Sequence, residues 1–232
     1  MPCYDKKLEA SREDFYDSVH GTREVDCVIT PVEVETMLHE DGLHFKNDIV
    51  PHQLDFPFSW TEERHDEGSG GYCRYVFVEA ARQLFGISVT EPLPFRATRN
   101  QDLKEVVLEK EGKVLLRFAV ANGFRNIQNI VQKLKRNKCP YDFVEIMACP
   151  AGCINGGAQL KPDDGDAKAL LLRAQDLYQT SHHATHEEGI IPLHIYKEWL
   201  GVEDPLEAST HHHLQTSFHA VEKMASALNI RW

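Results

Sequence analysis

The amino-acid sequence predicts an α/β fold in which a layered sheet packs against helices. Two observations carry this prediction. Stretches with the apolar spacing of helices alternate along the chain with short stretches rich in β-branched and aromatic residues, and that alternation is typical of sheets covered by helices. The chain has 232 residues, which is enough for one large domain or two small ones with a substantial core.

The first part of the chain predicts one strand, one helix and a loop. The apolar run VDCVIT over 25–30 predicts a buried strand, which would also bury Cys27. Pro31 begins a helical pattern and Gly42 ends it, because proline fits the first turn of a helix and glycine the position after the last. The stretch 43–70 is rich in proline and acidic residues and has little periodicity, which predicts a surface loop.

The middle of the chain predicts a helix followed by two paired strands. The helix over 70–86 has an apolar face made of Val76, Phe77, Ala80, Ala81 and Leu84. It also carries Cys73, which we expect to be a small buried hydrophobic residue. Residues 102–123 predict two strands joined at Glu111 and Gly112, a pair that favours a hairpin turn.

The later part of the chain predicts a helix, a strand and further helices. The helix over 124–137 has an apolar face made of Ile127, Ile130, Val131 and Leu134. The strand YDFVEIM over 141–147 follows it, and 166–180 predict another helix. We expect the whole of 164–232 to be a mainly helical extension that ends at Trp232.

Charge and composition argue against several classes of protein. The formal net charge is −11, and so acidic a chain is a poor candidate for binding the phosphate backbone of nucleic acids. No apolar run is long enough to span a bilayer, and the first residues lack the apolar core of a signal peptide. We therefore expect a location in the cytosol or nucleus, where free thiols or metal ligands are more common than disulfides.

The loop EIMACPAGCINGGAQ over 145–159 is the strongest candidate for a site. Cys149 directly follows the predicted strand, and Cys153 stands on the same loop. Its glycines allow positive φ angles and a close approach of the backbone, and backbone N–H groups of such a loop suit the sulfides of an iron–sulfur cluster. The alternatives are a buried structural cysteine pair and a zinc site, although zinc sites usually have two such pairs.

A third cysteine stands in the stretch MPCYDKKLEASR at the start of the chain. Lys6 and Lys7 follow Cys3, and positive charges favour a thiolate or an anionic cluster nearby. The alternative is an ordinary residue in a frayed terminus.

These two cysteine stretches together resemble two signature motifs of the iron-only hydrogenase large-subunit family. The segments TREVDCVIT and GSGGY stand between them in the order that the family shows. Residues 123–159 resemble more narrowly its eukaryotic branch without hydrogenase activity, which contains the nuclear prelamin A recognition factor and a component of cytosolic iron–sulfur assembly. The resemblance covers essentially the whole chain, and it implies a layered lobe of the hydrogenase fold that is incomplete at its N-terminus.

The resemblance also implies a set of cluster ligands. In the family the two motifs supply three of the four thiolates around a [4Fe–4S] cluster, and these correspond to Cys3, Cys149 and Cys153. In hydrogenases the last of them also bridges to a two-iron centre. The fourth ligand belongs to a Cys-Cys-Pro motif that this sequence lacks, so we expect the chain to be the C-terminal part of a longer protein. The family's third glycine after the second loop cysteine is replaced by Ala158.

The remaining cysteine and histidine motifs do not match ligands of the family. Cys139 precedes a proline shortly before Cys149, where it could substitute for a ligand. Clustered histidines over 182–186 and 211–213 could bind zinc or nickel adventitiously, with solvated loops as the alternative.

Trp232 is a candidate for binding a partner. A tryptophan beside a free carboxylate suits capture in a partner's pocket, and the alternative is packing on its own domain. The resemblance implies docking onto the cytosolic iron–sulfur targeting complex through a WD40-type subunit. The expected function is that of a non-enzymatic component that binds a [4Fe–4S] cluster and assists its delivery to client apoproteins. A prelamin-binding protein and a hydrogenase are the alternatives.

Overall fold

The computed structural model describes most of the chain up to Thr210. Described are residues 2–44, 46–50, 69, 71–90, 92–162, 165–180, 196–203 and 208–210. The chain divides into two compact units, Met1–His183 and Ala184–Trp232. The first contains the sheet, its helices and all six cysteines. In the second, the described residues form the π-helical turn η4 (Tyr196–Leu200) and the 3-10 turn η5 (Ala208–Thr210).

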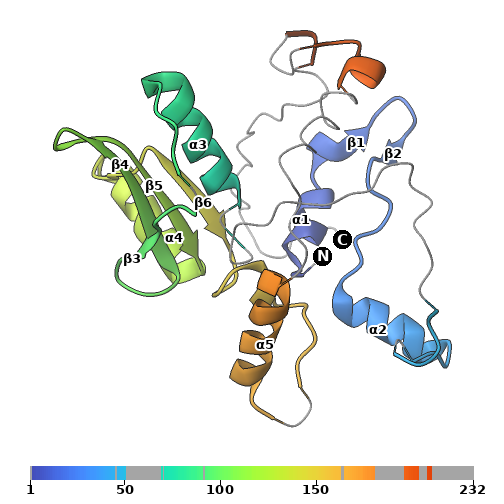
Figure 1. The fold of residues 1–232 in the computed structure, drawn as a ribbon. Helices are drawn as coiled ribbons and strands as arrows, with labels where there is room; N and C mark the ends of the chain where they lie inside the picture. Colours follow the sequence, from blue (N-terminus) through green and yellow to red (C-terminus); the bar gives the residue numbers. More distant parts are fainter. Residues whose placement is uncertain are drawn as a thin grey trace. The chain divides into compact units, whose positions relative to one another are not determined.

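A four-stranded sheet forms the centre of the first unit (Figure 1). Its strands lie in the order β3-β4-β5-β6 and run over Arg96–Ala97, Leu103–Lys110, Lys113–Asn122 and Phe143–Met147. The pairs β3–β4 and β4–β5 are antiparallel, whereas β5 and β6 are parallel. Helices connect and cover these strands, so the predicted α/β class is confirmed.

The hairpin between β4 and β5 is the one that the sequence predicts. Glu111 and Gly112 have positive φ angles of 55° and 75°, and they connect the paired residues Lys110 and Lys113. Positive φ at both central residues is what a two-residue hairpin turn requires, and glycine adopts it without a steric penalty. The turn therefore sets the register of the adjoining pairs, and a β-bulge between Leu108 and Glu109 shifts it along the rest of the two strands.

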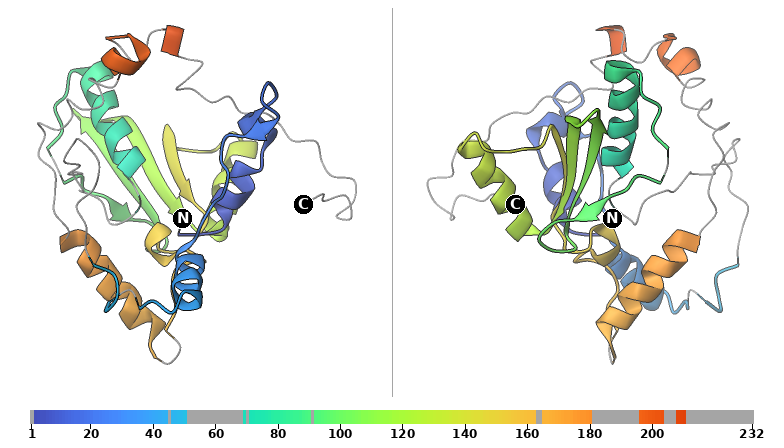
Figure 2. Two further views of the ribbon diagram at one scale, coloured as in Figure 1. Left: turned by 90° about the vertical axis from the view of Figure 1, so that its right-hand side faces the viewer. Right: turned by 60° about the vertical axis from the view of Figure 1, so that its left-hand side comes forward.

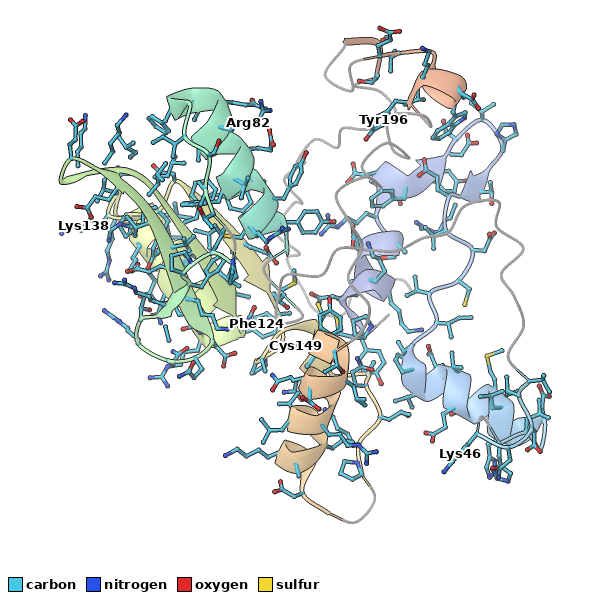
Figure 3. All side chains as sticks on the ribbon, viewed as in Figure 1. Lys46, Arg82, Phe124, Lys138, Cys149 and Tyr196 are labelled. Carbon is cyan, nitrogen blue, oxygen red and sulfur yellow. The ribbon has the colours of Figure 1, made fainter. Side chains whose placement is uncertain are left out.

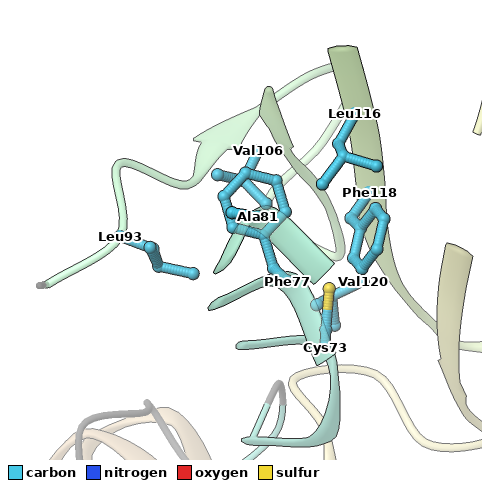
Figure 4. Packing of buried hydrophobic residues seen from close by; sticks show 8 residues of the cluster. All are labelled: Cys73, Phe77, Ala81, Leu93, Val106, Leu116, Phe118 and Val120. Carbon is cyan, nitrogen blue, oxygen red and sulfur yellow. The ribbon is translucent and has the colours of Figure 1, made fainter. Parts of the chain in front are cut away.

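Two helices cover opposite faces of the sheet, as both views of Figure 2 show. Helix α3 (Gly71–Phe85) packs on one face and α4 (Phe124–Lys135) on the other. Successive residues of a strand point to opposite faces, so β5 contributes to both sides of the core. The α3 side consists of Cys73, Phe77, Ala81, Leu93, Val106, Leu116, Phe118 and Val120 (Figure 4), and the α4 side of Leu103, Ala121 and Ile130.

Both helices are confirmed, but their predicted apolar faces are only partly buried. On α3, Phe77 is buried whereas Leu84 is 69% exposed. On α4, Ile130 is buried whereas Val131 and Leu134 are exposed. A helix that rests on one sheet buries only the strip of residues facing that sheet. Within the described residues, nothing covers the adjoining strip.

The segment before the sheet forms short elements. These are α1 (Asp5–Ala10), the 3-10 turn η1 (Glu13–Phe15), the paired strands β1 (Tyr16–Asp17) and β2 (Thr22–Arg23), and α2 (Pro31–Glu40). Helix α2 confirms the prediction made from Pro31 and Gly42, and Gly42 follows it with a φ of 69°.

The prediction of a strand over 25–30 is wrong. These residues form no strand, and Cys27 is exposed instead of buried. A strand needs a neighbouring strand for its backbone N–H and C=O groups. Here a side chain supplies one of the partners, because Lys7 Nζ donates to the carbonyl oxygen of Val28 at 2.7 Å. The apolar composition that predicted the strand contains no information about such a neighbour.

Helix α2 begins with a capping box that also binds α1. Glu33 Oε2 accepts a hydrogen bond from Thr30 N at 2.8 Å, and Thr30 Oγ1 accepts one from Glu33 N at 3.4 Å. Lys7 of α1 pairs with the same carboxylate, with 2.8 Å between Nζ and Oε1. The bonds from Lys7 and Thr30 lower the pKa of Glu33 to about 2. The carboxylate therefore stays charged at neutral pH and ties the segment after Cys3 to α2.

The helix predicted over 166–180 is also confirmed. Helix α5 (Ala167–Thr180) packs against η2, a 3-10 turn over Cys153–Asn155. The greater part of the predicted loop over 43–70 and both histidine clusters lie outside the described residues. Among the helices that the structure describes, none has both the length and the apolar character needed to cross a membrane.

Candidate functional site

The cysteine loop follows the C-terminal ends of the two parallel strands. Asn122 at the end of β5 pairs with Met147 at the end of β6, and Gly123 N donates to the carbonyl oxygen of Met147 at 2.8 Å. Figure 3 shows Cys149 beyond the end of β6. Open α/β sheets bind their ligands in the crevice outside the carboxyl ends of the strands. The fold therefore places the cysteines where such sheets hold ligands.

Hydrogen bonds fix the turn between Cys149 and Cys153. Gly152 N donates to the carbonyl oxygen of Cys149 at 3.1 Å, and Asp102 Oδ1 accepts a hydrogen bond from Ala151 N at 2.5 Å. Ala151 and Gly152 have positive φ angles of 59° and 75°. The side chain of Asp102, which lies in the connection between β3 and β4, thus holds the turn in place.

Gly156 lets the N-terminal segment approach this loop. Ala158 N donates to the carbonyl oxygen of Pro2 at 3.1 Å. A Cβ atom at position 156 would lie 2.0 Å from that oxygen and 2.6 Å from the carbonyl carbon, so a side chain at position 156 has no room. Because Cys3 follows Pro2 directly, the contact brings the third cysteine to the loop that carries the other two.

Cys3 and Cys149 lie near enough to Cys153 to influence its pKa. Burial raises the pKa of its thiol, and the negative charges of Cys3, Cys149 and Glu145 raise it further, whereas a hydrogen bond with Ser69 lowers it. Charges shift a pKa in this way only from nearby. A positively charged metal centre would stabilise the thiolate form that cysteine ligands need. The structure thus brings together all three cysteines that the resemblance singled out.

The donor set fits an iron–sulfur cluster better than a single metal ion. In the part of the chain that the structure describes, no three His, Cys, Asp or Glu side chains are placed to hold one ion. A cluster distributes its cysteine ligands over several iron atoms, so the ligands stand further apart than those of zinc. Three partly buried thiols, two on one turn and one on the N-terminal segment, match that arrangement.

The other three cysteines have different surroundings in the fold. Cys73 is buried in the core with its Sγ 3.8 Å from the carbonyl oxygen of Ala119, and burial with the charge of Glu145 raises its pKa to about 12. Cys27 is exposed. Cys139 precedes β6, whose five residues span about 16 Å, and so lies toward the opposite end of the strand from the loop.

Two polar residues beside the cysteines were not predicted from the sequence. Ser69 Oγ accepts a hydrogen bond from Cys153 N at 3.2 Å. Glu145 is 6% exposed, and its Oε2 accepts a hydrogen bond from Cys73 N at 2.7 Å near the start of α3. The signal for Glu145 is a single charge inside the apolar strand FVEIM, because charged residues are buried only when they have partners. Ser69 lies in a glycine-rich segment and gives no comparable signal.

The fold combines a mixed sheet with a cysteine loop that follows the carboxyl ends of its two parallel strands. Residues 1–157 match the family described as iron only hydrogenase large subunit, C-terminal domain. The chain belongs to this family, which implies an iron–sulfur cofactor.

Solved structures of [FeFe]-hydrogenases have the same fold. One, from a study of oxygen inactivation and degradation of the H cluster, has a TM-score of 0.71 and 26% identity, and the match covers 94% of this chain and 61% of that chain. A variant of the hydrogenase from Chlamydomonas reinhardtii has a TM-score of 0.69 and 26% identity, over 91% of this chain and 60% of that chain. The predicted hydrogenase-type fold is therefore confirmed.

Curated relatives are more similar in sequence. The cytosolic Fe-S cluster assembly factor narfl of Danio rerio is 51% identical over 238 residues, covering 100% of this chain and 57% of the relative. The cytosolic iron-sulfur assembly component 3 of Bos taurus is 51% identical over 237 residues, covering 100% of this chain and 49% of the relative. The chain thus spans about half the length of these relatives. Their names confirm the predicted branch of the family, and they are names of assembly factors instead of enzymes.

Proposed function

We propose that this chain acts in the cytosolic iron–sulfur protein assembly machinery. In this proposal Cys3, Cys149 and Cys153 bind a [4Fe–4S] cluster, and the protein assists cluster delivery to cytosolic and nuclear apoproteins. The observation that carries the proposal is the convergence of the three cysteines, joined by the contact of Pro2 with Gly156. The names of the relatives support the pathway and its cytosolic location.

Two segments of this chain supply the three cysteines of the proposed site. Cys149 and Cys153 come from one rigid turn, and Cys3 comes from the N-terminal segment. When bound, the cluster supplies iron and sulfide in a form that can be passed on. A [4Fe–4S] cluster has four ligand positions, and the two cysteine motifs of this chain supply three. The fourth ligand then comes from a small thiol or another polypeptide segment, and such an exchangeable position suits transfer better than permanent storage.

We infer that hydrogen turnover is not the role of this chain. The relatives that are 51% identical are named as assembly factors, whereas the hydrogenases are 26% identical. This difference supports the assembly role over the hydrogenase alternative.

Cysteine substitutions test the ligand assignment. Anaerobic reconstitution of the chain with iron, sulfide and a small thiol should produce the broad visible absorption of thiolate-bound iron. Cys149→Ala and Cys153→Ala should each lower the iron bound per chain, and the double variant should lose most of it, because a single thiolate remains. Iron and sulfide analysis, with electron paramagnetic resonance after reduction, measures the loss and identifies the cluster type.

Cys27→Ala is the matched control, because Cys27 is an exposed cysteine outside the two cysteine motifs. This variant should bind as much iron as the wild type. If the double variant also binds that amount, the assignment of Cys149 and Cys153 as ligands is wrong.

Removal of Trp232 tests the proposed docking onto the targeting complex. Trp232 lies outside the described residues, so this prediction rests on the sequence. Deletion of the residue should abolish recovery of the WD40-type subunit in a pull-down, because an aromatic anchor contributes a large share of the binding energy. Trp199→Ala is the control, since Trp199 is an exposed tryptophan of the same unit at 73% exposure. Unchanged recovery after the deletion would refute docking through the tail.

A further inference from the structure

The turn between Cys149 and Cys153 contains an alanine in a conformation that favours glycine. Gly152 N donates to the carbonyl oxygen of Cys149 at 3.1 Å, which closes a β-turn with Pro150 and Ala151 at its centre. Proline fixes the first central residue at a negative φ, whereas Ala151 has a φ of 59°. This combination is the pattern of a type II turn, whose second central residue is usually glycine. The backbone of Ala151 is therefore strained, because its Cβ disfavours positive φ.

One hydrogen bond from outside the turn holds Ala151 in this conformation. Asp102 Oδ1 accepts a hydrogen bond from Ala151 N at 2.5 Å, although the two residues are 49 positions apart in the sequence. Hydrogen bonds from a backbone N–H to a carboxylate are among the stronger ones in proteins. A strained residue persists only where the surrounding structure holds it. The carboxylate of Asp102 therefore offsets the cost of the conformation at Ala151.

The main chain of Asp102 is itself fixed to the sheet. Asn122 N at the end of β5 donates to the carbonyl oxygen of Asp102 at 2.8 Å, and Asp102 N donates to Asn100 Oδ1 at 2.9 Å. The side chains of Asn100 and Asn126 exchange two hydrogen bonds of 3.2 Å. Asn126 of α4 is 4% exposed, and its Nδ2 also donates to the carbonyl oxygen of Asn122 at 2.9 Å. The carboxylate thus projects from a backbone that β5 and α4 hold in place.

The conformation of Ala151 affects the separation of the two cysteines on the loop. Only Pro150, Ala151 and Gly152 stand between them. A change of one backbone angle in so short a connection moves one sulfur relative to the other. Ligands of a metal centre must be held close to their productive geometry, and the residues that hold them decide how well this succeeds.

We propose that Asp102 is a positioning residue of the cluster site, whose carboxylate holds Ala151 at positive φ and so keeps Cys149 and Cys153 at the separation that a cluster needs. The inference rests on the proposed function, because it takes these two cysteines to be ligands. It adds a residue from the connection between β3 and β4, far in sequence from both cysteine motifs. Through Asp102 the sheet helps to retain the cluster.

Asp102→Ala in the reconstituted 232-residue chain tests this inference. Without the acceptor the turn leaves its strained conformation more readily, so iron should pass to a chelator about three- to tenfold faster, as the loss of one hydrogen bond implies. Hydrogen exchange at the Ala151 amide, which reports the bond itself, should also accelerate in the cluster-free chain. Asp102→Asn keeps an oxygen acceptor and should restore most of both losses.

A second substitution distinguishes positioning of the turn from a general loss of stability. Ala151→Gly removes the steric cost of positive φ. The double variant Asp102→Ala with Ala151→Gly should therefore release iron more slowly than Asp102→Ala alone. Ala151→Gly by itself should not lower the melting temperature of the cluster-free chain, whereas glycine at an unstrained position does. This last measurement tests the strained turn even if Asp102→Ala does not fold.

Asp142→Ala is the matched control, because Asp142 makes the same kind of bond at the other end of β6. Its Oδ2 accepts a hydrogen bond from Arg117 N at 2.8 Å. Asp142 precedes β6, whereas the cysteine loop follows it. Asp142→Ala should therefore release iron at the wild-type rate.

A wild-type release rate in Asp102→Ala would overturn the inference, and so would equal acceleration in Asp142→Ala. Failure of Ala151→Gly to slow release in the double variant would overturn it as well, as would a lower melting temperature of Ala151→Gly alone. The cysteine variants separate these results from the proposed function. If they lose iron while Asp102→Ala behaves as the wild type, the inference alone fails. If they keep their iron, the proposed function fails.

Discussion

Replacing Gly156 by alanine is expected to lower the iron bound after anaerobic reconstitution to the level of a Cys3→Ala variant. The new Cβ would lie 2.0 Å from the carbonyl oxygen of Pro2 and 2.6 Å from its carbonyl carbon. Both are backbone atoms, which cannot rotate away as a flexible side chain can. The N-terminal segment would have to move, which breaks the hydrogen bond between Ala158 and Pro2 and removes Cys3 from the loop.

The neighbouring glycine provides the control for this prediction. A Cβ atom at Gly157 would have no atom within 4 Å, so Gly157→Ala should bind as much iron as the wild type. Melting of both variants without the cluster shows whether the fold itself is retained. Wild-type iron content in a folded Gly156→Ala variant would mean that Cys3 does not depend on this contact, and the proposed three-cysteine site would lose its main structural support.

The identity of the cysteines was predictable from the sequence, but the contacts that join them were not. Sequence motifs identify Cys3, Cys149 and Cys153, because the residues next to each cysteine in the sequence form a recognisable pattern. Their closeness depends on the packing of Pro2 against Gly156, and these residues belong to segments far apart in the sequence. A local sequence pattern shows which residue types are present, whereas contacts between distant segments depend on the folded structure.

The elements of the fold differ in how far local sequence determines them. The hairpin at Glu111 and Gly112 was predictable, because the geometry of a two-residue turn depends on its own residues. The prediction of a strand over 25–30 was wrong, because a strand depends on a neighbouring strand that its own sequence does not specify. Leu84 shares the apolar face of α3 but is exposed, for a related reason. Helical spacing shows which residues share a face, but not how much of that face the sheet covers.

Phe77→Ala is expected to lower the free energy of unfolding by about 3–5 kcal/mol. Phe77 is 1% exposed, and its ring meets that of Phe118 edge to face at a centroid distance of 5.2 Å. Truncation would leave a cavity in the core between α3 and the sheet, where close packing leaves little freedom to collapse. Urea unfolding of the cluster-free chain, followed by circular dichroism, measures the change. Such a loss is a large part of the stability of a typical domain.

Leu84→Ala is the matched control, because Leu84 belongs to the same helix but is 69% exposed. It should change the stability by less than about 0.5 kcal/mol. Equal losses in both variants would contradict the packing of α3 on the sheet. The two substitutions should also differ at the cysteine site. Because α3 follows Ser69 and begins at the Glu145 contact, loosening its core face in Phe77→Ala should speed iron release to a chelator, whereas Leu84→Ala should not.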